Sequence, residues 1–312
     1  MTAPFVSVII PCFNEQEIVA ETFHRVKSSV EGGWNNGHEI IFINDGSRDA
    51  TLFILKNFAA ENSSVRILNF SRNFGHQAAV TAGLANCKGD VAFIIDADLQ
   101  DPPELFETMY KLSVEKNCNV VNGVREKREG ESFFKKITAR IFYRLLNNLS
   151  DVNLNIDTGD FRMIDRKVIN AFNSFPEKNK YIRGLISWMG FKQESISYTR
   201  SARSKGKTKY PLGKMMKLAF VAIFYFSKKP LKISLTIGFI SILIGLLLMV
   251  WVFIQQALGL PLIKGWASTV IIVIFFGGIQ LVTIGVAGEY IGNILDEVKN
   301  RPEYLIEEKI NF

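Results

Sequence analysis

The stretch Val91-Ala92-Phe93-Ile94-Ile95-Asp96-Ala97-Asp98 joins five apolar residues directly to two carboxylates that are one position apart. The apolar run predicts a buried strand. Residues i and i+2 of an extended chain point to the same side, so both carboxylates can face one hard cation. Aspartate is also common in turns, and these three residues alone fit a pair of solvated turn carboxylates equally well.

The same arrangement, an apolar run followed by polar residues, occurs several times in the first part of the chain. The strand candidates are 6–10, 39–43, 65–70 and 91–95, and segments of helical period lie between them at 15–30, 50–61 and 77–87. Strands alternating with helices predict one α/β domain whose sheet is parallel at its start. Ligands of such open sheets bind beyond the carboxyl ends of the strands.

Polar motifs follow the first three strand candidates at that edge. They are Pro11-Cys12-Phe13-Asn14-Glu15, Asn44-Asp45-Gly46-Ser47 and Ser71-Arg72-Asn73-Phe74-Gly75-His76. Any one of them fits a helix cap or a turn. With Asp96-Ala97-Asp98 after the fourth strand candidate, however, they make four polar motifs in succession, which is less likely to arise by chance. The chain has no GxGxxG or GxxxxGK[ST] motif, which argues against a dinucleotide enzyme or a P-loop nucleotidase. A bound phosphate would therefore be held by a metal and side chains.

Two long segments near the other end, 233–254 and 266–288, contain no charged side chain. A membrane-spanning helix needs about 20 predominantly apolar residues, and a soluble core helix rarely stays apolar on every face for that length. A short, turn-rich segment separates the two runs. The pattern predicts a transmembrane helical hairpin.

Basic residues predict the orientation of this hairpin. Lys228, Lys229 and Lys232 precede it, Lys264 lies between the spans, and Lys299 and Arg301 follow it. This distribution places both termini in the cytoplasm. No secretion signal precedes the first strand candidate. The cysteines, Cys12, Cys87 and Cys118, are too few and too widely spaced for a zinc site or a disulfide framework, so we assign them to packing.

The 37 basic and 30 acidic residues give a formal net charge of +7, and the basic excess clusters between Lys192 and Lys217. A basic segment just before a membrane span more often meets anionic lipid headgroups than nucleic acid. We therefore expect the lipid bilayer as a partner and no nucleic acid.

Taken together, these motifs resemble the inverting family 2 glycosyltransferases with a GT-A fold, and within them the membrane-bound polyprenyl-phosphate glycosyltransferases. The resemblance covers essentially the whole chain and includes Asp96-Ala97-Asp98-Leu99-Gln100-Asp101-Pro102-Pro103 and Thr158-Gly159-Asp160-Phe161-Arg162. The bactoprenol glucosyltransferases look similar, and the dolichyl-phosphate mannose synthases look like more distant cousins.

We accordingly expect six parts along the chain. They are a cytoplasmic GT-A domain (1–210), an amphipathic juxtamembrane segment (211–231), a first transmembrane helix (232–256), a short external loop (257–265), a second transmembrane helix (266–290) and a cytoplasmic tail (291–312). A buried connecting helix is the alternative for 211–231.

The resemblance implies a nucleoside diphosphate sugar as the donor, usually a uridine nucleotide. The matching donor positions are Pro11, Asn14, Glu15, Asp45, Arg72 and Asp96. Asp96, Asp98 and Gln100 match the positions that coordinate Mg²⁺ or Mn²⁺, and Asp98 is thereby expected to be catalytic. A divalent cation stabilises the charge that develops on the departing diphosphate. The alternative for Gln100 is a solvated polar residue at a helix entry.

Asp160 matches the family's candidate general base. A lipid monophosphate has a second pKa near ~6 and arrives largely ionised, so a base is not strictly needed. Our hypothesis is that Asp160 orients the acceptor or takes a residual proton, and a structural hydrogen-bonding role is the alternative. The expected ligands of the acceptor phosphate are Arg125, Arg128, Arg200, Arg203 and Lys207, each of which also fits a solvated or lipid-headgroup role.

The implied reaction is metal-dependent, inverting transfer of a hexose, with glucose favoured by resemblance, from a UDP-sugar to undecaprenyl or another polyprenyl phosphate. It would occur at the cytoplasmic face of the inner (plasma) membrane and supply cell-envelope glycan modification, such as that of lipopolysaccharide or O-antigen. The alternatives are a processive polysaccharide synthase, whose QxxRW motif is not visible, and a non-catalytic scaffold that binds nucleotide sugar. Paired glycines at 277–278 and at 285 and 288 make a homo-oligomer plausible.

Overall fold

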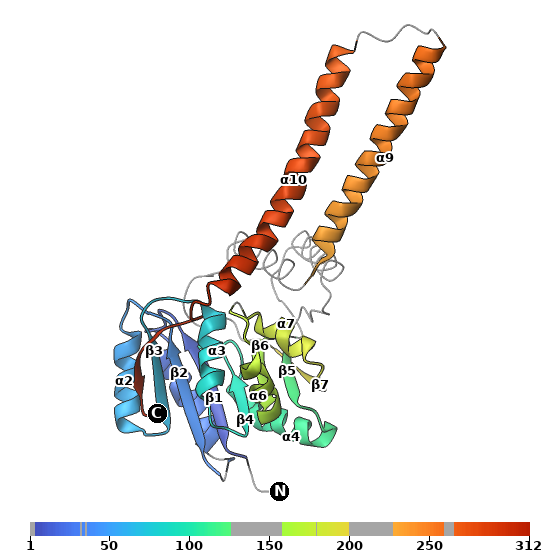
Figure 1. Cartoon of the computed structure of the whole chain (residues 1–312). Helices are drawn as coiled ribbons and strands as arrows, with labels where there is room; N and C mark the ends of the chain where they lie inside the picture. Colours follow the sequence, from blue (N-terminus) through green and yellow to red (C-terminus); the bar gives the residue numbers. More distant parts are fainter. Residues whose placement is uncertain are drawn as a thin grey trace. The chain divides into compact units, whose positions relative to one another are not determined.

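The structure is a computed structural model that describes residues 4–31, 33–34, 36–125, 158–178, 180–199, 227–258 and 265–312. The chain divides into two compact units. The described part of the first unit contains an eight-stranded sheet with the strand order β7-β5-β6-β4-β1-β2-β3-β8. The second unit contains two long helices. Figure 1 shows the chain coloured along the sequence, with labels on most of the elements.

The strands are β1 (Val6–Cys12), β2 (His38–Asn44), β3 (Val65–Phe70), β4 (Val91–Ile94), β5 (Val120–Arg125), β6 (Thr158–Asp165), β7 (Gln193–Tyr198) and β8 (Ile306–Ile310). The helices of the first unit are α1 (Val19–Glu31), α2 (Thr51–Glu61), α3 (His76–Asn86), the 3-10 helix η1 (Pro103–Leu105), α4 (Phe106–Lys116), α6 (Arg166–Ser174) and α7 (Ile182–Trp188). Those of the second unit are α9 (Lys229–Ala257) and α10 (Trp266–Val298).

The sheet is parallel at its start, as the sequence predicts. β1 pairs in parallel with both β2 and β4, and β2 pairs in parallel with β3. β6 then runs antiparallel to β4 and β5, which makes the sheet mixed. Because β1 to β4 share one direction, the polar motifs that follow them meet at a single edge of the sheet.

Helices cover both faces of the sheet, so the domain has three layers. The main core cluster joins side chains of β1, such as Val8 and Ile10, to side chains of α1, α2 and α4. In Figure 1, α3 and α6 lie on the near face. The close approach of α3 depends on Gly83, where an added Cβ would lie 2.4 Å from the side chain of Ile9. Asp165 starts α6 by accepting a hydrogen bond from the Val168 backbone N–H at 2.9 Å.

The last strand, β8, returns to the first unit after α10 and pairs antiparallel with β3. It covers the edge that β3 would otherwise expose, and in Figure 1 the red C-terminal segment runs beside the blue strands. Tyr304 stacks on Phe70 with ring centroids 5.1 Å apart, and the Ser71 backbone N–H donates to the carbonyl of Leu305 at 3.2 Å. The segment expected as a tail therefore contains a strand of the first unit's sheet.

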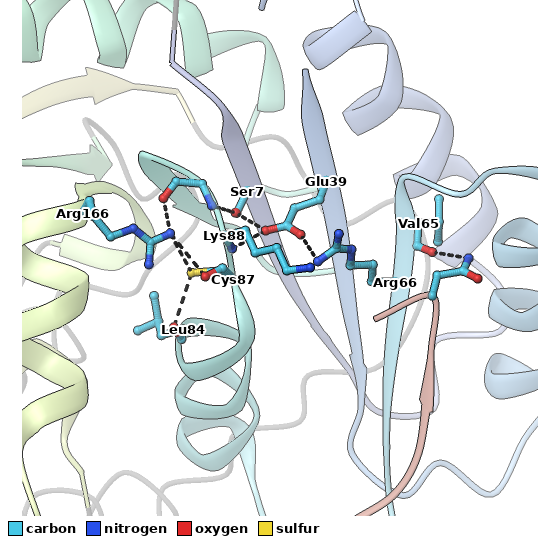
Figure 2. A network of polar contacts seen from close by, with 10 residues as sticks. Ser7, Glu39, Val65, Arg66, Leu84, Cys87, Lys88 and Arg166 are labelled. Atoms are coloured by element: carbon cyan, nitrogen blue, oxygen red, sulfur yellow. Dashed lines mark hydrogen bonds and ion pairs between the residues drawn. The ribbon is translucent and has the colours of Figure 1, made fainter. Parts of the chain in front are cut away.

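A buried polar network ties the strands together at their amino ends (Figure 2). The carboxylate of Glu39, which is 1% exposed, accepts hydrogen bonds from Ser7 Oγ at 2.5 Å and from the Lys88 backbone N–H at 2.6 Å. Arg66 completes the network with an ion-pair contact of 2.6 Å to Glu39. Arg166 donates to the carbonyls of Cys87 and Gly89 nearby. The network thus lies at the amino ends of the strands, opposite the carboxyl ends that the polar motifs follow.

The three cysteines are buried and form no disulfide, in agreement with the packing role that we assigned to them. Burial raises the pKa of the Cys87 thiol to about 11, so this residue stays a neutral thiol at physiological pH.

Both helices of the second unit are long and apolar enough to cross a membrane, over Lys229–Gln255 and Ile271–Val298. Their large apolar side chains are exposed along most of their length; Leu235 is 63% exposed and Leu281 is 72% exposed. So much exposed apolar surface suits a lipid environment better than water.

Candidate active site

Backbone N–H groups and side-chain oxygens join the loops after β1 and β2. The backbone N–H of Asn14 donates to Ser47 Oγ at 3.0 Å, and Asn14 Oδ1 accepts from the Arg48 backbone N–H at 2.9 Å. The Glu15 backbone N–H donates to Thr51 Oγ1 at 2.9 Å. Asn14 has φ of 54°, a left-handed conformation that asparagine tolerates better than most residues. The two motifs thus form one rigid platform at the carboxyl edge.

Asp45 connects this platform to the loop after β3. Asp45 is 3% exposed, and its carboxylate accepts hydrogen bonds from Asn73 Nδ2 at 2.8 Å and from the backbone N–H groups of Phe74 at 2.6 Å and Gly75 at 3.0 Å. Burial raises the pKa of Asp45, and the two backbone donors oppose that rise. Asp45 therefore organises the loop that carries Arg72.

The loop after β4 holds the two carboxylates under backbone strain. Thr22 Oγ1 in α1 donates to the carbonyl of Ala97 at 2.7 Å, and the Gln100 backbone N–H donates to Asp98 Oδ1 at 3.2 Å. Between them, Leu99 has φ of 54°, which is costly for a residue other than glycine or asparagine. Its side chain is only 6% exposed, so packing holds it in place. Such strain is typical of functional loops.

A cluster of opposite charges surrounds Asp160 of β6. Arg183 at the start of α7 donates two hydrogen bonds to it, from Nε to Oδ1 at 2.8 Å and from Nη2 to Oδ2 at 3.0 Å. His76 Nε2 at the start of α3 lies 3.2 Å from Asp160 Oδ2 and 3.8 Å from Asp96 Oδ1. These two contacts are ion pairs without hydrogen-bond geometry. Arg162 is the third cation, with Nη2 3.8 Å from Asp160 Oδ1.

The cluster shifts the proton affinities of its members. Burial alone would raise the pKa of Asp160, but Arg183 and His76 bring that pKa well below its usual range. Burial alone would lower the pKa of His76, but Asp160 and Asp96 raise it to about 9. Burial lowers the pKa of Arg162 to about 10. Asp160 is therefore a stable carboxylate and a weak base.

The carboxylates after β4 suit a divalent cation that the substrate also ligates. Burial raises the pKa of Asp96 to about 6, and the carboxylates of Asp160, Asp101 and Asp98 add to that rise. Carboxylates that repel one another in this way fit a cation site. Within the described residues, no group of three or more His, Cys, Asp or Glu side chains forms a complete metal cage. A site with one or two protein carboxylates plus substrate phosphates is the usual arrangement for Mg²⁺.

Several of the predicted site residues come together at this edge. Asn14, Asp45 and Arg72 belong to the interlocked loops, and His76 bridges Asp96 and Asp160. Pro11 is buried within β1 beside Ile43 of β2. The candidates Arg128, Arg200, Arg203 and Lys207 lie outside the described residues, as do the side chain of Arg125 and positions 211–226 of the segment expected to be amphipathic. The roles of all these residues remain predictions.

Sequence analysis did not single out His76 or Arg183 as site residues. His76 closes a motif that we had noted, and its position directly before a helix after a parallel strand was an available signal. Arg183 is 23 positions from Asp160 and in another element, so no spacing rule connects the two.

Solved structures with a similar fold are glycosyltransferases. A mannosyltransferase from Pyrobaculum calidifontis, solved with GDP-mannose and Mn²⁺, aligns with a TM-score of 0.52 and 16% identity over 72% of this chain and 64% of that one. Glucosyl-3-phosphoglycerate synthase from Mycobacterium tuberculosis, solved with Mn²⁺, UDP and phosphoglyceric acid, aligns with a TM-score of 0.50 and 19% identity over 71% and 76% of the two chains. The fold is that of the GT-A glycosyltransferases.

Sequence comparison gives the same class and specifies the family. The profile of Glycosyl transferase family 2 matches residues 7–172, and that of the GtrB C-terminal hairpin matches residues 229–294. The Bacillus subtilis glycosyltransferase YkcC is 46% identical over 96% of this chain and 93% of its own length. A prophage-derived bactoprenol glucosyl transferase of Shigella flexneri is 36% identical over 97% of both. The protein is thus a glycosyltransferase. It belongs to glycosyl transferase family 2.

Proposed function

We propose that this enzyme transfers a hexose from a UDP-sugar to undecaprenyl phosphate with inversion at the anomeric carbon. The hexose that we expect is glucose. The observation that carries the proposal is the joining, in one chain, of a family 2 domain to a hairpin of two exposed apolar helices. A soluble acceptor would not require such a hairpin, whereas an acceptor with an isoprenoid tail lies in the bilayer beside it.

The relatives support this choice of acceptor. Bactoprenol glucosyl transferases align with this chain at 35–36% identity over 97% of it, hairpin included. The product would be a lipid-linked sugar for modification of a cell-envelope glycan. A processive polysaccharide synthase would need a carbohydrate channel, and the two apolar helices found among the described residues cannot form one within a single chain.

The donor would lie on the side of the sheet formed by β1, β2 and β3. Asn14, Asp45 and Arg72 belong to the loops that follow these strands, and Asp96 and Asp98 follow β4 beside them. Asp96, Asp98 and Gln100 would hold a Mg²⁺ or Mn²⁺ ion, which stabilises negative charge on the leaving diphosphate. The protein's own contribution is to hold the sugar diphosphate in a fixed orientation at this edge.

The fold supports a hairpin whose two ends lie on the same side of the membrane. The chain leaves the first unit before α9 and returns to it after α10, because β8 pairs with β3. The basic residues before α9 and after α10 favour the cytoplasm for that side. The catalytic domain and both termini would therefore face the cytoplasm.

The proposal is tested with the full-length protein in detergent, undecaprenyl phosphate and a panel of radiolabelled UDP-sugars. We expect label in the extracted lipid with one of these sugars, loss of that label with EDTA, and its recovery with Mg²⁺ or Mn²⁺. The Asp98→Ala variant should give none. Label in a polymer, or no transfer from any donor, would contradict the proposal.

A further inference from the structure

Arg183 is held in a fixed position by a carboxylate within the proposed active site. A guanidinium carries five N–H donors, and Asp160 takes two of those of Arg183, at 2.8 and 3.0 Å. Both hydrogen bonds that the Arg183 side chain donates to described residues go to Asp160. The Arg183 side chain is 32% exposed, so its other N–H groups can reach a ligand.

The position of Arg183 in the fold separates it from the donor side of the sheet. The loops that carry Asn14, Asp45 and Arg72 follow β1, β2 and β3, and β4 stands next to β1. Asp160 belongs to β6, on the far side of β4. In an inverting reaction the acceptor attacks the anomeric carbon opposite the leaving diphosphate. If the diphosphate lies above β1 to β4, the acceptor approaches from the side of β6.

The charges around Asp160 leave an excess of cations for an anionic ligand. The guanidinium groups of Arg183 and Arg162 both lie within 4 Å of the single carboxylate of Asp160. A phosphate monoester carries about −1.5 to −2 charges near neutral pH and offers three acceptor oxygens. The planar fork of an arginine matches such a group in geometry as well as in charge.

From this arrangement we propose that Arg183, oriented by Asp160, binds the phosphate of the lipid acceptor. The inference rests on the proposed function. It adds to that function the residue that binds the acceptor phosphate on the β6 side of the sheet. Asp160 is then a positioning residue: it fixes the guanidinium before the acceptor arrives, which lowers the entropy lost on binding. The acceptor phosphate arrives ionised and its oxygen attacks the anomeric carbon, while the bond from that carbon to the diphosphate breaks. No proton has to move to Asp160.

The test compares Arg183→Ala, Arg183→Lys and Asp160→Asn with the wild-type protein in the transfer assay. KM for undecaprenyl phosphate and KM for the UDP-sugar are measured separately, together with hydrolysis of the UDP-sugar in the absence of lipid. Arg25→Ala is the matched control, because Arg25 makes the same kind of two-oxygen contact with Glu104 in an exposed pair.

For Arg183→Ala we expect a rise of about 10- to 100-fold in KM for undecaprenyl phosphate, as for the loss of a hydrogen bond between charged groups. KM for the UDP-sugar and its hydrolysis should stay within about threefold of wild type. Arg183→Lys should show a smaller rise, because lysine keeps the charge but lacks the fork. Asp160→Asn should also raise the lipid KM while leaving the pH profile of turnover unchanged. Arg25→Ala should match wild type.

Three results would overturn the inference, and the kinetic constants distinguish them. A rise in KM for the UDP-sugar instead of the lipid would assign Arg183 to the donor diphosphate. Unchanged constants in Arg183→Ala, with wild-type transfer intact, would leave Arg183 a structural role only. No transfer by the wild-type protein to undecaprenyl phosphate would refute the proposed function and this inference with it.

Discussion

Replacing Glu39 by alanine should strongly destabilise the first unit without touching the active site. Glu39 is 1% exposed and accepts two hydrogen bonds in addition to its ion pair with Arg66, whose side chain is 15% exposed. Removing one partner of a buried pair leaves the other charge uncompensated and costs about 3–5 kcal/mol. For a domain of about 150–250 residues this corresponds to a fall of about 6–20 °C in Tm.

The assay is thermal unfolding of the full-length protein in detergent, with Glu104→Ala as the control. Glu104 pairs with Arg25 at 2.9 Å, but its side chain is 56% exposed, so its loss should cost at most about 1 kcal/mol. A double variant, Glu39→Leu with Arg66→Met, should recover part of the loss because it removes both charges. Recovery should stay incomplete, because the Lys88 backbone N–H loses its acceptor.

This reasoning fails if Glu39→Ala costs no more than Glu104→Ala, because the buried carboxylate would then contribute little to stability. It also fails if the double variant is as unstable as Glu39→Ala. Since the network lies at the edge opposite the active site, KM for the UDP-sugar should be unchanged in each variant that remains folded.

Three further predictions concern the active edge of the sheet. Gly46→Ala should raise KM for the UDP-sugar at least about tenfold, because φ of Gly46 is +63° and a Cβ would lie 2.4 Å from the backbone of Arg72. Gly33→Ala is the control, because the space around its Cβ is open. Equal KM values for the two variants would contradict the prediction. Tyr304→Ala should lower the free energy of unfolding by at least about 0.5–1.5 kcal/mol through loss of its stacking on Phe70, and Tyr304→Phe should keep that stability in chemical denaturation; a loss in both variants would assign the effect to the hydroxyl. Asp98→Ala should abolish metal-dependent transfer while leaving Tm within about 2 °C of wild type, because Asp98 is only half-buried and accepts a local hydrogen bond from the Gln100 backbone N–H; transfer that persists in this variant and in EDTA would remove the metal from the account.

The first half of the sheet could be predicted from the sequence, because local patterns determine it. The strand candidates 6–10, 39–43, 65–70 and 91–95 each overlap an observed strand, and β3 has the predicted bounds. The first helix is the main difference, since α1 begins at Val19 and not at position 15. A hydrogen-bonded turn precedes the helix, because the Glu15 carbonyl accepts from the backbone N–H groups of Ile18 and Val19, while the Glu15 N–H is bonded to Thr51 Oγ1 of α2.

The strand β8 could not be predicted, because its partner is more than 200 residues away. Its sequence, Ile306-Glu307-Glu308-Lys309-Ile310, is short and mostly charged, which is typical of an edge strand and also of a solvated tail. Contacts across the chain distinguish the two, such as the ion pair of 2.6 Å between Lys56 and Glu308.

The candidate site also combines features that neighbouring residues in the sequence reveal with features that depend on contacts between distant residues. The carboxylates after β4 are visible from a strand followed by Asp-x-Asp, whereas the environment of Asp160 is not. That environment comes from α3 through His76 and from α7 through Arg183. The motif around Asp160 was consistent with a base, and its contacts show a carboxylate already paired with Arg183 and close to His76 and Arg162.

The most direct test of the account follows the acceptor phosphate itself by ³¹P NMR, with purified full-length protein, undecaprenyl phosphate and the UDP-sugar that labels the lipid. The account predicts that the phosphomonoester signal is replaced by a phosphodiester signal as UDP appears in equal amount, and that undecaprenol without a phosphate yields no product. A phosphomonoester that remains unchanged while UDP is released would contradict it, because the sugar would then have gone to another acceptor.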